Sequence, residues 1–275
     1  MGDQNEHRIR TGIGGWTFEP WRGGNFYPEG LPHAQELHWA SRQLPAIEIN
    51  GTFYRNQTPA TFAKWRDATP RGFMFSVKAS QYCTHRRVLA EAGESVDRFI
   101  NSGVAELGEK LGPVVWQFMP SKVFDPDDFS AFLGLLPERR DGVALRHVLD
   151  VRHPSFRDPA FVAMARRHRC AIVFTDADKF VSIPDATTDF VYARLMMASA
   201  DVVTGYDDAA LDRWTQCARA WSEGKRPVGL EQVSPEDGPE TDRRDVFVYF
   251  INGAKERAPA AAAAMLRRLG LAPLA

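Results

Sequence analysis

Short runs of β-branched and aromatic residues alternate with longer segments of helical periodicity along almost the whole chain. Each run has about the length of a buried strand, and most are followed by residues typical of loops. The runs that predict strands are residues 9–14, 46–50, 73–78, 114–118, 146–151, 171–175, 190–195 and 246–251.

The segments between these runs predict helices. Thr58 and Pro59 supply an N-cap and a proline at the first helical position, ahead of the apolar Phe62 and Trp65. The other expected helices span residues 95–111, 125–136, 158–168, 207–221 and 254–269. Residues 176–189, between the sixth and seventh strands, form a connection too short and polar for a full helix.

About eight strand–helix alternations in one chain predict an α/β fold, a closed TIM-type (β/α)8 barrel with an irregular or short sixth helix connection. An open doubly wound sheet is the rival fold. No GxGxxG motif follows the first strand, so a dinucleotide site is not indicated. We expect a disordered segment at residues 1–7 and a single barrel domain over residues 8–275.

Composition adds limits on function and location. The 275 residues include 34 Lys plus Arg and 35 Asp plus Glu, so the chain is not generally basic. The polar start MGDQNEHRIR does not resemble a secretory signal, and no stretch is apolar enough to predict a membrane span. Cys83, Cys170 and Cys217 are far apart and odd in number, which favours free thiols in a reducing cytoplasm.

Alternation along the strands points polar side chains at the barrel axis. In the third predicted strand, Lys78 shares a face with Met74 and Ser76, opposite the apolar Phe75 and Val77. The same parity turns further polar residues inward, namely Glu48, Asn50, Asp150, Arg152, Tyr192 and Arg194. Gln117, Asp176 and Asn252 stand at the ends of the fourth, sixth and eighth strands. Since barrel enzymes carry their chemistry on the C-terminal face, these residues predict a ligand site there. The alternative is that strand ends are polar simply because strands stop there.

Several longer motifs resemble the YecE-like family (domain of unknown function 72). They are GIGGWTFEPWRGGNFYPEGLP, AIEINGTFYRNQTPATFAKWRDATPRGFMFSVKAS, THRRVL, LGEKLGPVVWQFMPS and LDVRHPSF, in the family's order and over nearly the whole chain. The resemblance implies a TIM-type barrel, in agreement with the alternation. It implies no particular reaction, because the family has none securely established.

Individual positions of this chain match the family's motifs, and a few differ from them. The positions that match the family's motifs are Trp16, Glu48, Asn50, Phe53, Tyr54, Lys78, His85, Gln117, Arg152, His153, Asp176 and Arg194. Asp150 stands where the family usually has glutamate, Met196 where it favours histidine after the seventh strand, and Ile251 where it commonly has asparagine. The chain therefore lacks an imidazole that the family carries at the mouth.

The predicted chemistry is that of a possible hydrolase or acid/base enzyme. Glu48, Asp150 and Lys78 are the candidate catalytic residues; a structural salt-bridge lattice is the alternative for the two carboxylates. Lys78, Arg152 and Arg194 suit phosphate or carboxylate oxygens, so we expect a small anionic, sugar- or nucleotide-like ligand. The candidate ligand-binding residues are Trp16, Asn50, Tyr54, His85, Gln117, Arg152, His153, Asp176, Arg194 and Asn252.

Other functions stay open at this point. Aromatic residues after the first two strands and the basic pair Arg86 and Arg87 also suit a nucleic-acid-binding or nuclease-like barrel. A non-catalytic binding protein is the third alternative. No cofactor is predicted. A divalent metal held by Glu48, His85, Asp150, His153 and Asp176 is a minor alternative, because no HxH or HExxH spacing is present. Oligomeric state cannot be read from the sequence.

Overall fold

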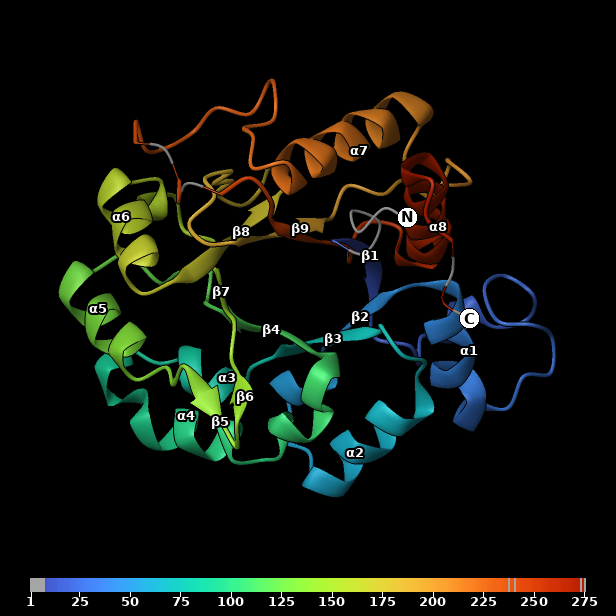
Figure 1. Cartoon of the computed structure of the whole chain (residues 1–275), viewed down its shortest axis with the longest axis horizontal. Helices are drawn as coiled ribbons and strands as arrows, with labels where there is room; N and C mark the ends of the chain where they lie inside the picture. The colour runs from blue at the N-terminus through green and yellow to red at the C-terminus, as the bar shows by residue number, and fades with distance from the viewer. Residues whose placement is uncertain (1–7, 237, 240, 273, 275) are drawn as a thin grey trace.

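Eight parallel strands close into a barrel in the computed structural model, with the helices arranged outside it (Figure 1). Their order is β1-β10-β9-β8-β7-β4-β3-β2, and parallel pairing of β2 with β1 completes the ring. The structure describes residues 8–236, 238–239, 241–272 and 274, so the predicted disordered segment 1–7 lies outside the described residues. The barrel strands are β1 (Ile9–Gly14), β2 (Ala46–Ile49), β3 (Met74–Lys78), β4 (Leu111–Gln117), β7 (His147–Asp150), β8 (Cys170–Thr175), β9 (Phe190–Leu195) and β10 (Asp245–Phe250).

The TIM-type barrel predicted from the sequence is confirmed. All eight expected strands are present, and residues 176–189 connect β8 to β9 without a helix, as their polar character predicts. The helices are α1 (Glu36–Gln43), α2 (Pro59–Ala68), α3 (Gln81–Thr84), α4 (Gly93–Ile100), α5 (Pro126–Gly134), α6 (Pro159–Arg167), α7 (Asp208–Ser222) and α8 (Ala258–Leu269). Short 3-10 turns lie at Glu19–Trp21, His33–Gln35, Gly51–Phe53, Leu89–Ala92, Val104–Lys110, Pro154–Phe156 and Lys255–Arg257.

Several helices begin where side-chain caps and prolines specify a start. The Thr58 hydroxyl accepts a hydrogen bond from the backbone N–H of Thr61 at the start of α2. Asp158 and Asp207 cap α6 and α7 in the same way. Such caps satisfy backbone donors that the first helical turn leaves free, and each contributes about 1 kcal/mol.

The predicted helix 95–111 is wrong in its second half. Helix α4 ends at Ile100, a 3-10 segment follows at Val104–Lys110, and Leu111 already belongs to β4. The break lies at Gly103, which has a φ of 109° in the left-handed region. A Cβ atom at Gly103 would come within 2.5 Å of the Cα atom of Pro59, so close packing against the start of α2 interrupts the helix.

A small antiparallel hairpin, absent from the sequence prediction, precedes β7. Its strands β5 (Arg139–Arg140) and β6 (Val143–Ala144) are joined by Asp141 and Gly142. Both turn residues have positive φ, at 48° and 80°. An Asp-Gly pair suits this type of two-residue turn, so the hairpin follows from local chemistry.

Apolar side chains fill both faces of the barrel wall. Phe75 and Val77 pack outward into the layer beneath the helices, whereas Met74 and Val148 lie in a separate cluster inside the barrel. The alternation predicted for the third and fifth strands is therefore confirmed. Because the middle of the interior is packed with apolar side chains, inward polar residues lie at the two ends of the barrel. Arg10, Arg146 and Asp245 form ion pairs at the N-terminal end, and the remaining set lies at the C-terminal mouth. No helix among the described residues is long and apolar enough to cross a membrane.

Candidate functional site at the barrel mouth

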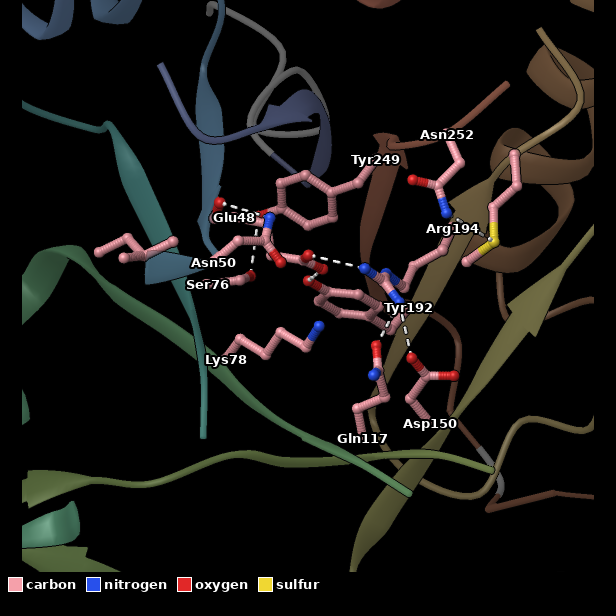
Figure 2. Close-up of polar contacts among 12 residues, drawn as sticks. Glu48, Asn50, Ser76, Lys78, Gln117, Asp150, Tyr192, Arg194, Tyr249 and Asn252 are labelled. Carbon is pink, nitrogen blue, oxygen red and sulfur yellow. Dashed lines mark hydrogen bonds and ion pairs between the residues drawn. The ribbon is translucent and has the colours of Figure 1, made fainter. Parts of the chain in front are cut away.

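Polar side chains from five strands meet at the C-terminal mouth of the barrel (Figure 2). Each stands at or next to the last residue of its strand and points toward the axis, because it shares parity with the inner apolar cluster. The residues and their strands are Glu48 on β2, Lys78 on β3, Gln117 on β4, Asp150 on β7 and Arg194 on β9. The side chains of this mouth cluster lie close together, as the predicted parity requires.

Arg194 joins the two carboxylates of the mouth cluster. Its Nη2 donates to Oε1 of Glu48 at 3.0 Å, and its Nη1 donates to Oδ2 of Asp150 at 2.6 Å. The Tyr192 hydroxyl donates to the other oxygen of Glu48 at 2.7 Å. All three ionic groups are buried, so this pairing offsets the cost of removing their charges from water.

Arg152 forms the outer part of the same network. Its Nη2 donates to Oε1 of Gln117 at 2.6 Å and to Oδ2 of Asp150 at 3.1 Å. The guanidinium also lies over the ring of Phe180, 4.4 Å from the centroid. The Nη1 atom of Arg152 makes no hydrogen bond to any residue that the structure describes. Arg152 thus holds the wall of the mouth and keeps one donor available.

The arginines set the charge state of Asp150. Burial by itself would raise the pKa of this carboxyl, but the charges of Arg194 and Arg152 outweigh burial, and the pKa lies below its ordinary value. For Arg194, burial works against the charge while Glu48 and Asp150 favour it, and the net effect is a raised pKa. The Arg194–Asp150 pair is therefore ionised throughout the neutral range.

Lys78 has a different environment from the arginines. Its Nζ lies 4.1 Å from the centre of the Phe53 ring, and the residue is only 7% exposed. Among the described residues, no oxygen or ring nitrogen accepts a hydrogen bond from this amine. Burial and the nearby charge of Arg194 lower the pKa of Lys78 to about 8, against the opposing effect of Glu48 and Asp150. Lys78 is thus the cation of the mouth without a carboxylate partner in the described structure.

His85 and Tyr54 both pack against Phe53, the ring that Lys78 also contacts. His85 follows α3, and its ring centroid lies 5.2 Å from that of Phe53. The Nε2 atom of His85 is buried and meets no hydrogen-bond partner in the described parts of the chain. Burial, with the charges of Lys78 and Arg152, lowers the pKa of His85. Tyr54 packs edge-on against Phe53 and is 69% exposed, so it stands at the rim.

A cavity of about 330 Å³ opens beside the mouth, at the ends of β1 and β2. Asn50 lies on its wall and donates weakly from Nδ2 to the backbone oxygen of Glu48, at 3.3 Å. Trp16 lines the cavity and packs edge-on against Trp65, with ring centroids 5.2 Å apart. The remaining lining residues include Gly14, Gly15, Thr17, Phe18, Ile49, Gly51, Gln57 and Lys255.

Three predicted ligand-binding residues make other contacts. Nδ1 of His153 accepts from the backbone N–H of Ser155 and so caps a short 3-10 turn. Asp176 accepts from the backbone N–H of Met196 and from the Tyr206 hydroxyl, which fixes the loop after β9. The Asn252 amide lies 3.8 Å from the Met196 sulfur. None of the three forms a hydrogen bond or ion pair with the mouth cluster within the described structure, and their role in ligand binding stays a prediction.

The metal-ligand set considered from the sequence does not come together as one group among the described residues. Within the described ranges, no three His, Cys, Asp or Glu side chains gather as a group able to hold a metal ion. His153 and Asp176 make the loop contacts given above, while Glu48 and Asp150 are held by Arg194. The described geometry therefore gives this alternative no support.

Two tyrosines complete the mouth. Strand parity turned Tyr192 inward, but neither Tyr192 nor Tyr249 was among the candidate catalytic or ligand-binding residues. Tyr192 binds Glu48, and the Tyr249 hydroxyl lies 2.8 Å from the Ser76 hydroxyl. Tyr192 stands two positions before Arg194 and Ser76 two positions before Lys78, so each shares the inward face of its neighbour. Parity alone was a sufficient signal for these residues.

Comparison with known proteins identifies the family. A family model described as a protein of unknown function, DUF72, matches residues 10–275. The chain belongs to the DUF72 family. The resemblance noted in the sequence is therefore confirmed, and it extends over all eight strands except the first residue of β1.

The comparisons also find one similar sequence and several similar solved structures. The UPF0759 protein YunF of Bacillus subtilis is 32% identical over 117 residues, which cover 41% of this chain and 40% of that protein. A crystal structure of a DUF72 family protein from Thermotoga maritima has a TM-score of 0.72 at 21% identity, covering 96% of this chain and all of the other. A DUF72 family protein from Enterococcus faecalis has a TM-score of 0.69 at 16% identity, covering 98% of this chain and all of its own. At these identities the structures establish the barrel alone.

Proposed function

We propose that the barrel mouth binds a small anionic ligand and that Lys78 is the residue that attracts it. The mouth holds three cations, Lys78, Arg152 and Arg194, against two carboxylates, Glu48 and Asp150. Both carboxylates are paired with the arginines, which leaves Lys78 without an ion-pair partner of its own in the described structure. This buried amine without an ion-pair partner is the observation that carries the proposal. A phosphate or carboxylate would supply the missing negative charge where screening by water is weak.

Arg152 is the second group suited to the anion. Its side chain is partly exposed, at 13%, and Nη1 is free of described partners. A guanidinium held by Gln117 and Asp150 has a fixed orientation, so a ligand oxygen can meet the free donor without ordering the side chain first. Lys78 then supplies the charge and Arg152 the directional hydrogen bond.

The cavity beside the mouth suits the remainder of such a ligand. Trp16, Phe18 and Trp65 provide ring surfaces, and the Asn50 and Gln57 amides provide polar groups. Sugar rings and nucleobases bind between aromatic faces and amide groups in many proteins. We therefore keep the sugar- or nucleotide-like class as part of the proposal.

The proposed chemistry is acid/base catalysis at the mouth. The pKa of Lys78 is lowered to about 8 and the pKa of His85 lies below its ordinary value, while the Lys78 amine and the His85 Nε2 atom have no described hydrogen-bond partner, so we assign proton exchange to these two groups. Glu48 and Asp150 are the carboxylates proposed from the sequence as an acid/base pair. Their contacts suit them to hold Arg194 in place, which is the salt-bridge alternative considered for them.

Calorimetric titration with inorganic phosphate tests the anion site. We expect Lys78→Met to weaken binding at least tenfold, about 1.4 kcal/mol, and Arg152→Ala to weaken it by a smaller factor. Lys64→Met is the matched control, because Lys64 is exposed on α2. Equal affinity in the wild type and Lys78→Met would contradict the proposal.

A nucleic-acid ligand is the second candidate function. Tyr54 and Tyr82 are 69% and 67% exposed on the connections after the neighbouring strands β2 and β3, and Arg87 is exposed nearby in sequence. Exposed aromatic and basic side chains suit stacked bases and phosphates. Oligonucleotide binding that weakens steeply as salt rises would favour this function, whereas binding of phosphate alone favours the small ligand.

A further inference from the structure

The surroundings of Lys78 favour the neutral, deprotonated form of its amine. The neutral form is favoured by burial against Phe53 and by the absence of an acceptor among the described residues. The charged or titratable groups that act on it are Glu48, Asp150, Arg152, Arg194 and His85. A neutral lysine amine has a free electron pair and is a nucleophile, whereas a lysine that only attracts anions needs no such environment.

His85 lies near the Lys78 amine and can carry protons to and from it. The Lys78 ammonium lies over the Phe53 ring, and the His85 ring packs edge-on against that same ring. The Nε2 atom of His85 is buried without a described partner, so it is available for a proton. Burial and nearby cations lower the pKa of His85, which favours the neutral ring that can act as a base.

We propose that Lys78 is a nucleophile that forms an imine with the carbonyl carbon of a small carboxylate- or phosphate-bearing ligand, and that His85 exchanges the protons. The inference rests on the proposed anion site, because the anionic group must bring the carbonyl to the amine. Arg152 is placed to hold that group through its free Nη1, since its other two nitrogens hold Asp150 and Gln117. The ligand class is a 2-oxo acid or a phosphorylated aldehyde or ketone.

The step balances without any further reactant. The neutral Lys78 nitrogen attacks the carbonyl carbon, and a carbon–nitrogen bond forms while the carbonyl oxygen gains negative charge. His85 accepts the first proton from the attacking nitrogen and passes it to this oxygen, which gives a neutral carbinolamine. His85 then moves the second nitrogen proton to the hydroxyl, the carbon–oxygen bond breaks, one water molecule leaves, and the imine remains. No oxidant or reductant takes part.

Reductive trapping tests the imine. The full-length protein is incubated separately with pyruvate and with dihydroxyacetone phosphate in the presence of cyanoborohydride, which converts an imine to a stable amine adduct. We expect one adduct per chain by intact mass spectrometry, located at Lys78 by peptide mapping. The trapping rate should reach half its maximum near pH 8, because the pKa of Lys78 is lowered to about 8. The faster of the two probes identifies whether the anionic group is a carboxylate or a phosphate.

Three variants separate the imine from simple anion binding. Lys78→Arg keeps the positive charge and removes the nucleophile, so it should bind phosphate but form no adduct at the mouth. Lys64→Arg, on the exposed face of α2, should behave as the wild type. His85→Gln should slow trapping at least tenfold while the adduct stays on Lys78.

The outcomes of the two proposals are distinguishable. Adducts spread over exposed lysines, with Lys78 no faster than the others, overturn the imine. Phosphate binding that depends on Lys78 without any adduct at this residue also overturns the imine but leaves the anion site standing. If the wild type neither binds phosphate nor forms an adduct, both the anion site and the imine are rejected.

Discussion

Arg194 donates from Nη1 to Oδ2 of Asp150 at 2.6 Å, although the two residues lie on β9 and β7 with β8 between them in the sheet. The contact therefore spans the inside of the barrel and not two adjacent strands. It also fixes the guanidinium whose other end holds Glu48. The polar mouth is consequently part of what holds these strands together, and its removal has measurable effects on stability.

Replacing Arg194 should destabilise the protein strongly. Arg194→Met leaves the carboxylates of Glu48 and Asp150 buried without their central partner, and breaking such a pair costs about 3–5 kcal/mol. Chemical denaturation of the variant and the wild type measures the loss. The control is Arg98→Ala, which removes an exposed pair with Glu94 and should change stability by less than about 1 kcal/mol. A loss no larger than in the control is incompatible with a structural role for the network.

Lys78→Met should stabilise the protein at pH 7. The folded chain holds Lys78 with a pKa of about 8, below its ordinary value, so the unfolded chain binds more protons between pH 8 and about 10.4. Wild-type stability therefore rises with pH across this window and carries a penalty below it. We expect a gain on the order of 2 kcal/mol for the variant at pH 7, shrinking toward pH 10. Unfolding measured at pH 7, 8.5 and 10 tests the trend, and a pH-independent difference contradicts it.

Asp150 should contribute stability that is lost in acid. Its pKa lies below the ordinary value in the folded chain, despite burial, because of Arg194 and Arg152. The contribution is thus fully present above pH about 4 and disappears as the pH falls through the folded pKa. We expect the stability difference between wild type and Asp150→Asn to shrink as the pH falls from 6 to 2. Urea denaturation at each pH measures it, and a difference that grows in acid is the opposite result.

Gly103→Ala should destabilise the outer layer of helices. The left-handed backbone and the 2.5 Å approach to Pro59 leave no room for a methyl group, so we expect a loss of about 2–4 kcal/mol. Gly134→Ala is the matched control, because a Cβ there meets no neighbour within 4 Å and the residue ends α5. The control should change stability by less than about 1 kcal/mol. Melting temperatures of the two variants decide between these expectations.

Local patterns were sufficient to predict most of the barrel. Strand runs and alternation placed Glu48, Lys78 and Asp150 correctly because strand parity depends only on neighbouring residues. Helix α1 was missed, and the break at Gly103 was missed because it arises from contact with Pro59, which is distant in sequence. Long-range packing of this kind leaves no local pattern.

The partners of the charged residues could not be predicted either. The sequence placed Lys78, Arg152 and Arg194 together as one cationic set, whereas only Lys78 lacks a carboxylate partner in the described structure. The contact of Arg194 with Glu48 joins residues 146 positions apart. Similarly, Asp176 follows the inward Thr175, so it turns toward the loop after β9 and binds Tyr206. Which ions pair depends on side-chain reach in three dimensions.

The pairing of β1 with β10 has a consequence for synthesis of the chain. Ile9 is matched with Val246, so one edge of the first strand finds its neighbour only after the last strand has left the ribosome. Until then β1 presents unpaired backbone groups, which in other proteins promote association between chains. Contacts so distant in sequence also slow folding. Nascent chains halted before β10 should therefore depend on chaperones more than chains released at full length.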